Sequence, residues 1–166
     1  MANWLQFDKL KAWSYLTLPF FQYDAVTDAQ ISSALADTAN LVQVDTALDW
    51  EDDFWLARHT GIREADKHAY RVAALVAQMR AGRVMESAIC LDTFCNGQCG
   101  CCISNGHHRL RALQYLGLSA GPFALSGYLD PLEDLVRQAG CPMPAEAAAF
   151  VSKELQATTE EDVWPE

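Results

Sequence analysis

The sequence of 166 residues lacks a long hydrophobic run, although 51% of its residues are hydrophobic. No apolar stretch approaches the ~18 residues of a membrane-spanning helix, so we expect no membrane span. The first residues also lack a basic region followed by an apolar stretch and a small-residue cleavage site, which favours a soluble, cytoplasmic protein. The hydrophobic fraction excludes a disordered chain, and the length is typical of one domain rather than two.

Positive charge is scarce, because 12 Lys and Arg residues stand against 22 Asp and Glu residues and the formal net charge is -10. A protein with this overall field attracts nucleic acid poorly. The charges are nevertheless segregated. The segment from Arg58 to Arg111 contains eight basic and four acidic residues, a formal charge of +4, together with all four histidines, whereas the rest of the chain carries -14. This distribution predicts an anion-binding region in the middle segment, unless its charges spread over solvated helix faces.

The sequence lacks the two separated ligand pairs that are typical of structural zinc sites. Four of its six cysteines lie within residues 95–102, and two histidines follow them. We interpret the cysteines as free thiols, which predicts neither stoichiometric zinc nor an obligatory disulfide. The alternative is a redox role or a tetrahedral metal site, with four ligands drawn from Cys95, Cys99, Cys101, Cys102, His107 and His108.

Hydrophobic periodicity predicts a helix followed by a hairpin in the middle of the sequence. Apolar residues at three- and four-residue steps indicate a helix over 66–81, with Gly82 as its left-handed C-terminal cap. Residues 84–91 have the pattern of a strand, residues 92–100 that of a turn-rich connection, and residues 101–104 that of a second short strand.

The remaining segments are predicted with the same patterns. Leucines at helical spacing indicate a helix that begins at His107 and ends near Gly117. The acidic residues between 45 and 53 favour the positive end of a helix. Two further strands are expected over 41–44 and 122–128, and a short helix over 131–140.

The junction between the second strand and the helix at His107 carries the main functional signal. Ser104, Asn105 and Gly106 allow a tight turn, and the helix that follows presents unpaired amides and its positive dipole end. A basic first turn opposes that dipole, and a bound anion would relieve the conflict. We therefore predict a phosphate site here, with donors from Ser104, Asn105, Gly106, His107, His108, Arg109 and Arg111.

The run NGHHRLRALQYLG, preceded by a helix that ends in glycine and by a strand, resembles the signature of the ParB and sulfiredoxin superfamily. In ParB-type partition proteins the run is Gly-Glu-Arg-Arg, an apolar residue, Arg and Ala. His107 replaces the glutamate and His108 the first arginine, and His107 also stands where sulfiredoxins have their catalytic cysteine. The residues that agree with the ParB run are Gly106, Arg109, Arg111 and Ala112, with Gly82 as the shared upstream glycine.

The resemblance implies one compact α/β (α+β) domain, in which helices flank a small mixed sheet. It covers about residues 66–130 of a domain that we place at residues 1–152, and an acidic C-terminal tail is expected over 153–166. Because the chain is small and has no helix-turn-helix module after the ParB-like part, it is most similar to the plasmid fertility-inhibition factors of the oncogenic-suppression type. That similarity implies an enzyme that hydrolyses ATP, cleaves DNA and blocks transfer through a type IV secretion system.

From the resemblance we assign expected roles in metal binding, catalysis, nucleotide binding and DNA binding. Phosphate hydrolysis needs a metal ion or a base that orients water. We expect Glu86 and Asp92 to hold Mg²⁺, and Glu86, His107, His108 and Arg109 to be catalytic. Nucleotide binding is expected to involve Gly82 in addition to the junction. The residues expected to contact DNA are Arg58, Arg63, Arg83, Arg109 and Arg111.

A binding protein without catalysis is the alternative. In that interpretation a degenerate ParB fold uses a nucleotide to control contact with a secretion-system protein, such as the coupling protein or the relaxase–DNA complex. The acidic exterior favours this interpretation because it repels duplex DNA at long range. Assays with ATP, or another nucleoside triphosphate, and with DNA distinguish the two.

Overall fold

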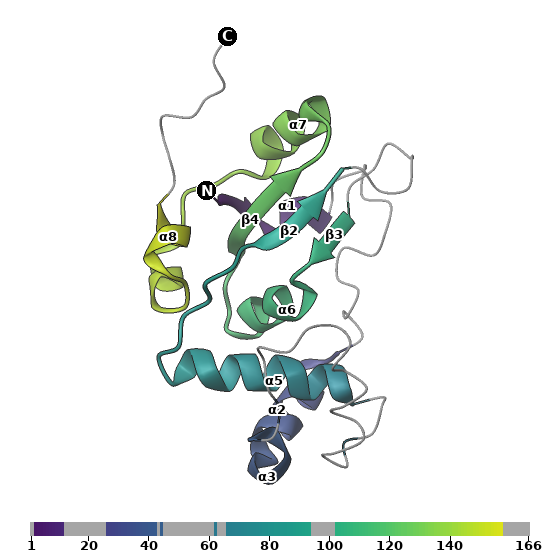
Figure 1. Cartoon of the computed structure of the whole chain (residues 1–166), viewed down its shortest axis with the longest axis vertical. Helices are drawn as coiled ribbons and strands as arrows, with labels where there is room; N and C mark the ends of the chain where they lie inside the picture. Colours follow the sequence, from purple (N-terminus) through teal and green to yellow (C-terminus); the bar gives the residue numbers. More distant parts are fainter. Residues whose placement is uncertain are drawn as a thin grey trace.

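The computed structural model of the chain describes residues 2–11, 26–42, 44, 62, 66–93 and 102–157. In these residues helices and a mixed sheet alternate along the chain, and Figure 1 shows the sheet with helices around it. The fold is therefore mixed α/β, as the sequence predicts. None of the helices in these ranges is long and apolar enough to cross a membrane.

The described strands form one sheet in the order β1-β4-β2-β3. β1 pairs antiparallel with β4, β4 pairs parallel with β2, and β2 and β3 form an antiparallel hairpin. The predicted hairpin and the mixed character of the sheet are thus confirmed. The strand bounds are Asn3–Gln6 for β1, Ile89–Asp92 for β2, Cys102–Asn105 for β3 and Ala120–Ser126 for β4.

Helix α6 lies between the sheet and helix α5, and helix α2 packs against α5 (Figure 1). The predicted helices in the middle and C-terminal parts are confirmed with nearly the expected limits. The helices are α1 (Phe7–Lys11), α2 (Asp28–Ala36), α3 (Thr38–Leu41), α5 (Lys67–Arg80), α6 (His107–Tyr115), α7 (Leu129–Ala139) and α8 (Lys153–Gln156), with a 3-10 helix over Ala145–Ala149.

Helix α6 contributes to two hydrophobic clusters. Leu110 and Leu113 belong to the cluster that fills the space around the sheet, together with the fully buried Phe123. Ala112 belongs to a second cluster, in which it packs with Ile31 of α2 and with the buried face of α5. Because both clusters hold α6, the position of its first turn is fixed from two sides.

Two predicted limits differ from the structure. The strand predicted over 84–91 begins only at Ile89, and before it Met85 makes an isolated bridge to Val151. Folded structure also continues into the segment predicted as an acidic tail, because the indole Nε1 of Trp4 donates to the carbonyl of the buried Leu155 at 3.0 Å. Residues 158–166 lie outside the described ranges.

The strand predicted over 41–44 is wrong, because Leu41 ends helix α3. Asp37 caps this helix: its carboxylate accepts hydrogen bonds from the backbone and the side-chain amide of Asn40. The hydroxyl of Tyr70 in α5 also donates to Asp37, at 2.7 Å, and hydrogen bonding holds the pKa of this carboxyl below its usual value. These capping contacts outweigh a weak alternating pattern. The helix predicted from residues 45–53 lies outside the described residues.

Candidate functional site

Gly106 forms the turn between β3 and α6, and its conformation requires glycine. Its φ is +96°, in the left-handed region, where it serves as the N-cap of α6. A Cβ atom there would lie 3.1 Å from the Cα of Ile89 and 3.3 Å from the guanidinium of Arg109. The predicted turn is therefore confirmed, and it places the first amides of α6 beside the start of β2.

Arg109 is folded back over this turn. Its Nη1 donates to the carbonyl of Ser87 at 2.7 Å, and its Nη2 lies 3.4 Å from Oδ1 of Asn105. Burial lowers the pKa of Arg109, and the nearby Cys90 partly offsets this effect. An arginine stays charged at neutral pH despite such a shift. The guanidinium is thus held at the junction, in the region where the sequence predicts a phosphate.

His107 and His108 occupy the first turn of α6 and are both withdrawn from solvent. His107 is 8% exposed, and burial lowers its pKa. Burial, followed by the positive charge of Arg71, lowers the pKa of His108 to about 2. The lowered pKa favours the neutral ring at physiological pH, and the catalytic role expected of His108 stays a prediction.

His68, in the first turn of α5, contacts His108 and was not among the predicted site residues. Its Nδ1 lies 2.9 Å from Nε2 of His108, and the two rings stack with centroids 5.2 Å apart. The sequence placed all four histidines in one segment, but no local pattern pairs residues 40 positions apart. Proximity between these rings depends on how α5 packs on α6.

Helices α5 and α6 run parallel, so that their N-terminal ends lie side by side (Figure 1). At the other end of the pair, the guanidinium of Arg80 lies 5.6 Å from the ring centroid of Tyr115. Neither helix has an acidic residue in its first turn. The positive ends of two helix dipoles therefore meet at the His68–His108 contact.

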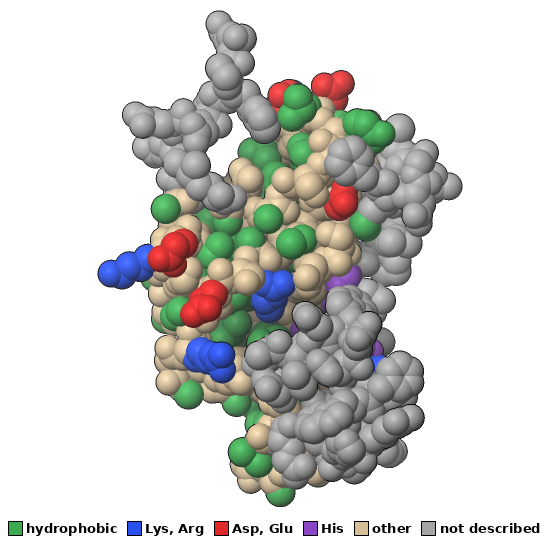
Figure 2. Space-filling model, in the orientation of Figure 1, with side chains coloured by type: hydrophobic (Ala, Val, Ile, Leu, Met, Phe, Trp, Pro, Cys, Tyr) green, Lys and Arg blue, Asp and Glu red, His purple; other side chains and the backbone are tan. Residues whose placement is uncertain are grey.

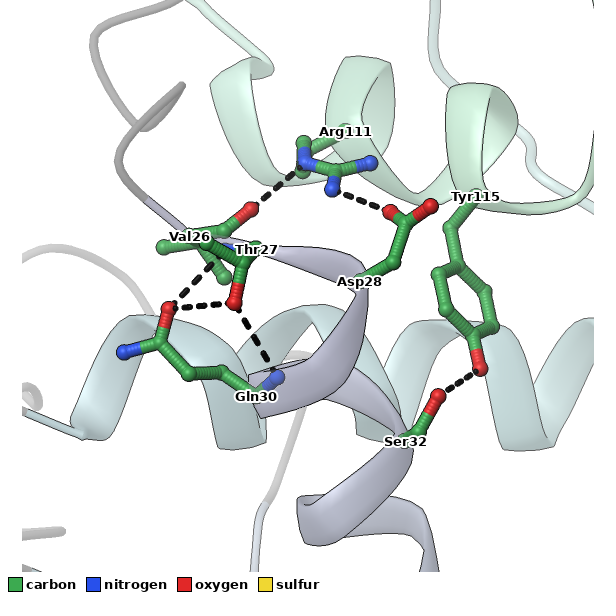
Figure 3. Close-up of polar contacts among 7 residues, drawn as sticks. All are labelled: Val26, Thr27, Asp28, Gln30, Ser32, Arg111 and Tyr115. Atoms are coloured by element: carbon green, nitrogen blue, oxygen red, sulfur yellow. Dashed lines mark hydrogen bonds and ion pairs between the residues drawn. The ribbon is translucent and has the colours of Figure 1, made fainter.

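Arg111 points toward the start of α2 (Figure 3). Its Nε donates to the carbonyl of Val26 at 2.9 Å, and its Nη2 lies 2.5 Å from Oδ1 of Asp28. The side chain is 13% exposed, whereas that of Asp28 is 74% exposed. One turn further along α6, the hydroxyls of Tyr115 and Ser32 share a hydrogen bond of 2.8 Å. Arg111 thus holds α2 onto α6, and its contact with phosphate stays a prediction.

The predicted nucleotide residues Gly82 and Ser104 lie in different surroundings. Gly82 follows the C-terminal end of α5, about 20 Å along this 14-residue helix from the end that contacts α6 through His68. Ser104 is exposed near the junction, and its hydroxyl donates to the carbonyl of Cys90 at 3.5 Å. The structure therefore brings Ser104 to the turn and keeps Gly82 at the far end of α5.

The two carboxylates predicted to hold Mg²⁺ lie toward opposite ends of β2. Glu86 is exposed and precedes Ser87, the partner of Arg109. Asp92 pairs with Cys102, which is three residues, or about 10 Å, along β3 from Asn105 at the junction. Within the described ranges no three His, Cys, Asp or Glu side chains form a group that fits a metal ion. Of the two predicted ligands, Glu86 is the one that is adjacent in sequence to a residue that binds Arg109.

On the face drawn in Figure 2, the Lys and Arg side chains that the structure describes are scattered among acidic, hydrophobic and uncharged ones. Arg83 is exposed and donates to the side chain of Gln78 at 3.3 Å. Arg58 and Arg63 lie outside the described residues, as do Cys95, Cys99 and Cys101.

The expectation of free thiols throughout is wrong at one position. Cys102 is disulfide-bonded, whereas Cys90 and Cys141 are free thiols. Composition alone does not reveal which thiols come within bonding distance, because that depends on the connection between β2 and β3.

Comparison with known proteins found no relative of this chain. No family model matches the chain, and the searches of curated proteins and of solved structures likewise found no match.

Proposed function

We propose that this protein binds the phosphates of a nucleoside triphosphate, ATP in the first instance, at the Gly106 turn. The observation that carries the proposal is the position of Arg109. Its guanidinium lies against Gly106 and is oriented by Ser87 and Asn105, next to the backbone amides at the start of α6. Amides at a helix start and a guanidinium are the donors that phosphate oxygens accept best.

The catalytic part of the proposal follows the family resemblance. ATP hydrolysis and DNA cleavage that block transfer through a type IV secretion system are the activities it implies. Mg²⁺ neutralises phosphate charge, and one carboxylate together with the phosphates commonly suffices to hold it. Glu86 fits that part because it neighbours the carbonyl that binds Arg109. Arg109, His107 and the backbone amides of α6 would then orient the phosphates.

The second candidate is a nucleotide-gated module that inhibits a secretion or coupling protein without catalysis. One observation favours it: Asp92 pairs with Cys102, three residues along β3 from Asn105 at the junction. This leaves Glu86, which precedes the partner of Arg109, as the predicted carboxylate for the metal ion. A site with phosphate donors and a single carboxylate suits binding at least as well as turnover.

Purified protein, titrated with ATP in the presence and absence of Mg²⁺, tests the proposal. We expect saturable binding that inorganic triphosphate competes for, followed by phosphate release and nicking of single- or double-stranded DNA. Absence of saturable binding would contradict both candidates. Binding without phosphate release or DNA cleavage would instead support the second candidate and reject the first.

Glu86→Gln separates binding from turnover. If the protein is an enzyme, this variant should retain ATP affinity but lose phosphate release. Glu133→Gln is the matched control, because Glu133 is likewise an exposed glutamate but lies on α7, away from the turn. Equal phosphate release by the two variants would remove Glu86 from the catalytic set.

A further inference from the structure

The contact between His68 and His108 joins the start of α5 to the first turn of α6. One ring nitrogen donates to the other across 2.9 Å, and the rings stack at an angle of 28°. His108 follows the Gly106 turn by two residues, so that this contact is made within the turn of α6 to which we assign the phosphates. His68 thereby reaches the candidate site without belonging to the junction.

Because His108 is neutral, its hydrogen bond with His68 fixes which ring nitrogen donates and which accepts. Burial lowers the pKa of His108 most, and four nearby side chains add to this effect and favour the neutral ring: Arg71, His68, His107 and Lys67. A neutral imidazole has one donor and one acceptor nitrogen. The partner on Nε2 therefore determines which nitrogen of His108 carries the proton and how the ring is oriented.

The same helix pair has a second ring contact that provides a comparison. Arg80 lies over the ring of Tyr115 at the C-terminal ends of α5 and α6. Both contacts hold the same two helices together. Only the His68–His108 contact lies at the ends where the two helix dipoles are positive, and only this one adjoins the turn.

We propose that His68 is a positioning residue of the nucleotide site, which fixes the ring of His108 and holds the start of α5 beside the bound phosphates. The proposal rests on the proposed function. It extends the site from one helix start to two, and it assigns to α5 a part in nucleotide binding that the sequence motif places in α6 alone. The ligand class is the one already named, a nucleoside triphosphate.

The test compares ATP affinity in three variants. His68→Ala removes the partner of His108 and should weaken ATP binding about 5- to 10-fold, the factor that corresponds to one neutral hydrogen bond. His68→Asn retains a side-chain donor and acceptor near the position of Nδ1 and should restore most of the affinity. Arg80→Ala removes the contact at the other end of the helix pair and should leave ATP affinity unchanged.

Each result decides a different point. Unchanged affinity in a folded His68→Ala protein overturns the role of His68 and leaves the proposed function intact. An equal loss in Arg80→Ala also overturns it, because the effect would then arise from general packing of α5 on α6. If the wild-type protein binds no ATP, both the proposed function and this extension fail.

A measurement on the wild-type protein covers the case in which His68→Ala does not fold. Imidazole nitrogen signals report the tautomer and the hydrogen bonding of each histidine. Saturating ATP should shift the signals of His68 and His108 together, because they share one hydrogen bond. Signals that both stay unchanged at saturation would overturn the proposal.

Discussion

Helix α6 presents two arginines, two positions apart, to two different regions of the molecule. Arg109 faces the sheet side, where it lies against Gly106 and donates to Ser87. Arg111 faces the helical side, where it binds Val26 and Asp28 at the start of α2. Two positions correspond to about 200° around a helix, so the two side chains leave opposite sectors. Residues that one motif groups together thus have separate tasks, which are phosphate binding and helix docking in our account.

The glycines that flank α6 extend this comparison and give the largest expected effect. Gly106→Ala should lower the free energy of unfolding by about 2–3 kcal/mol, because the left-handed φ is strained for alanine and its Cβ approaches the Cα of Ile89. Gly117 also has a positive φ, 86°, but nothing lies within 4 Å of a Cβ there. Gly117→Ala should therefore cost only about 1 kcal/mol. Denaturant unfolding of both variants measures the difference, and equal losses would show that the approach to β2 is unimportant.

Removal of Arg111 tests the docking side. Arg111→Ala should lower the free energy of unfolding by about 2 kcal/mol, since the carbonyl of the buried Val26 loses its donor. The exposed Asp28 adds little to this loss. Arg137→Ala is the control, because Arg137 is exposed and pairs with Asp134 on its own helix α7. A change below about 0.5 kcal/mol is expected there. Similar losses in the two variants would contradict the docking role.

His108, at the start of α6, should make the free energy of unfolding depend on pH. In the folded protein, burial above all lowers the pKa of His108 from the ordinary histidine value of 6.5 to about 2. The unfolded chain therefore binds the proton more tightly, and the stabilisation, full above pH 6.5, is lost progressively as the pH falls toward 2. Between pH 7 and 5.5 this residue should account for a loss of about 1 kcal/mol. His108→Asn should show a shallower dependence over that interval, and identical slopes would contradict a buried neutral ring.

Local patterns predicted the parts of the fold that depend on local contacts. The apolar steps of α5, the hairpin of β2 and β3, and the glycine at the start of α6 each involve residues close in sequence. The strand over 41–44 failed because a four-residue alternation is weaker than the cap that Asp37 provides with Tyr70, 33 residues away. How well a feature could be predicted therefore depended on how far apart its residues lie in the sequence, and not on the strength of the motif.

The same limit applies to the candidate site. The turn at Gly106 and the arginine beside it follow from the order of residues, whereas His68 reaches His108 over 40 positions and Asp28 reaches Arg111 over 83. Whether an arginine binds a ligand or a neighbouring helix depends on what packs beside it. The motif therefore predicted which residues gather near α6, but not that Arg111 would contact Val26 and Asp28.

The most direct test of the central claim is the ATP affinity of Arg109→Ala and Arg111→Ala at a fixed ionic strength near 0.15 M. If the phosphates bind at the Gly106 turn, Arg109→Ala should weaken binding about 10- to 100-fold, the range for a charge-assisted hydrogen bond. Arg111→Ala should stay within about twofold of the wild type at temperatures where α2 remains docked, since remote sites contribute independently. Equal loss in both variants, or unchanged affinity in folded Arg109→Ala, would contradict the account.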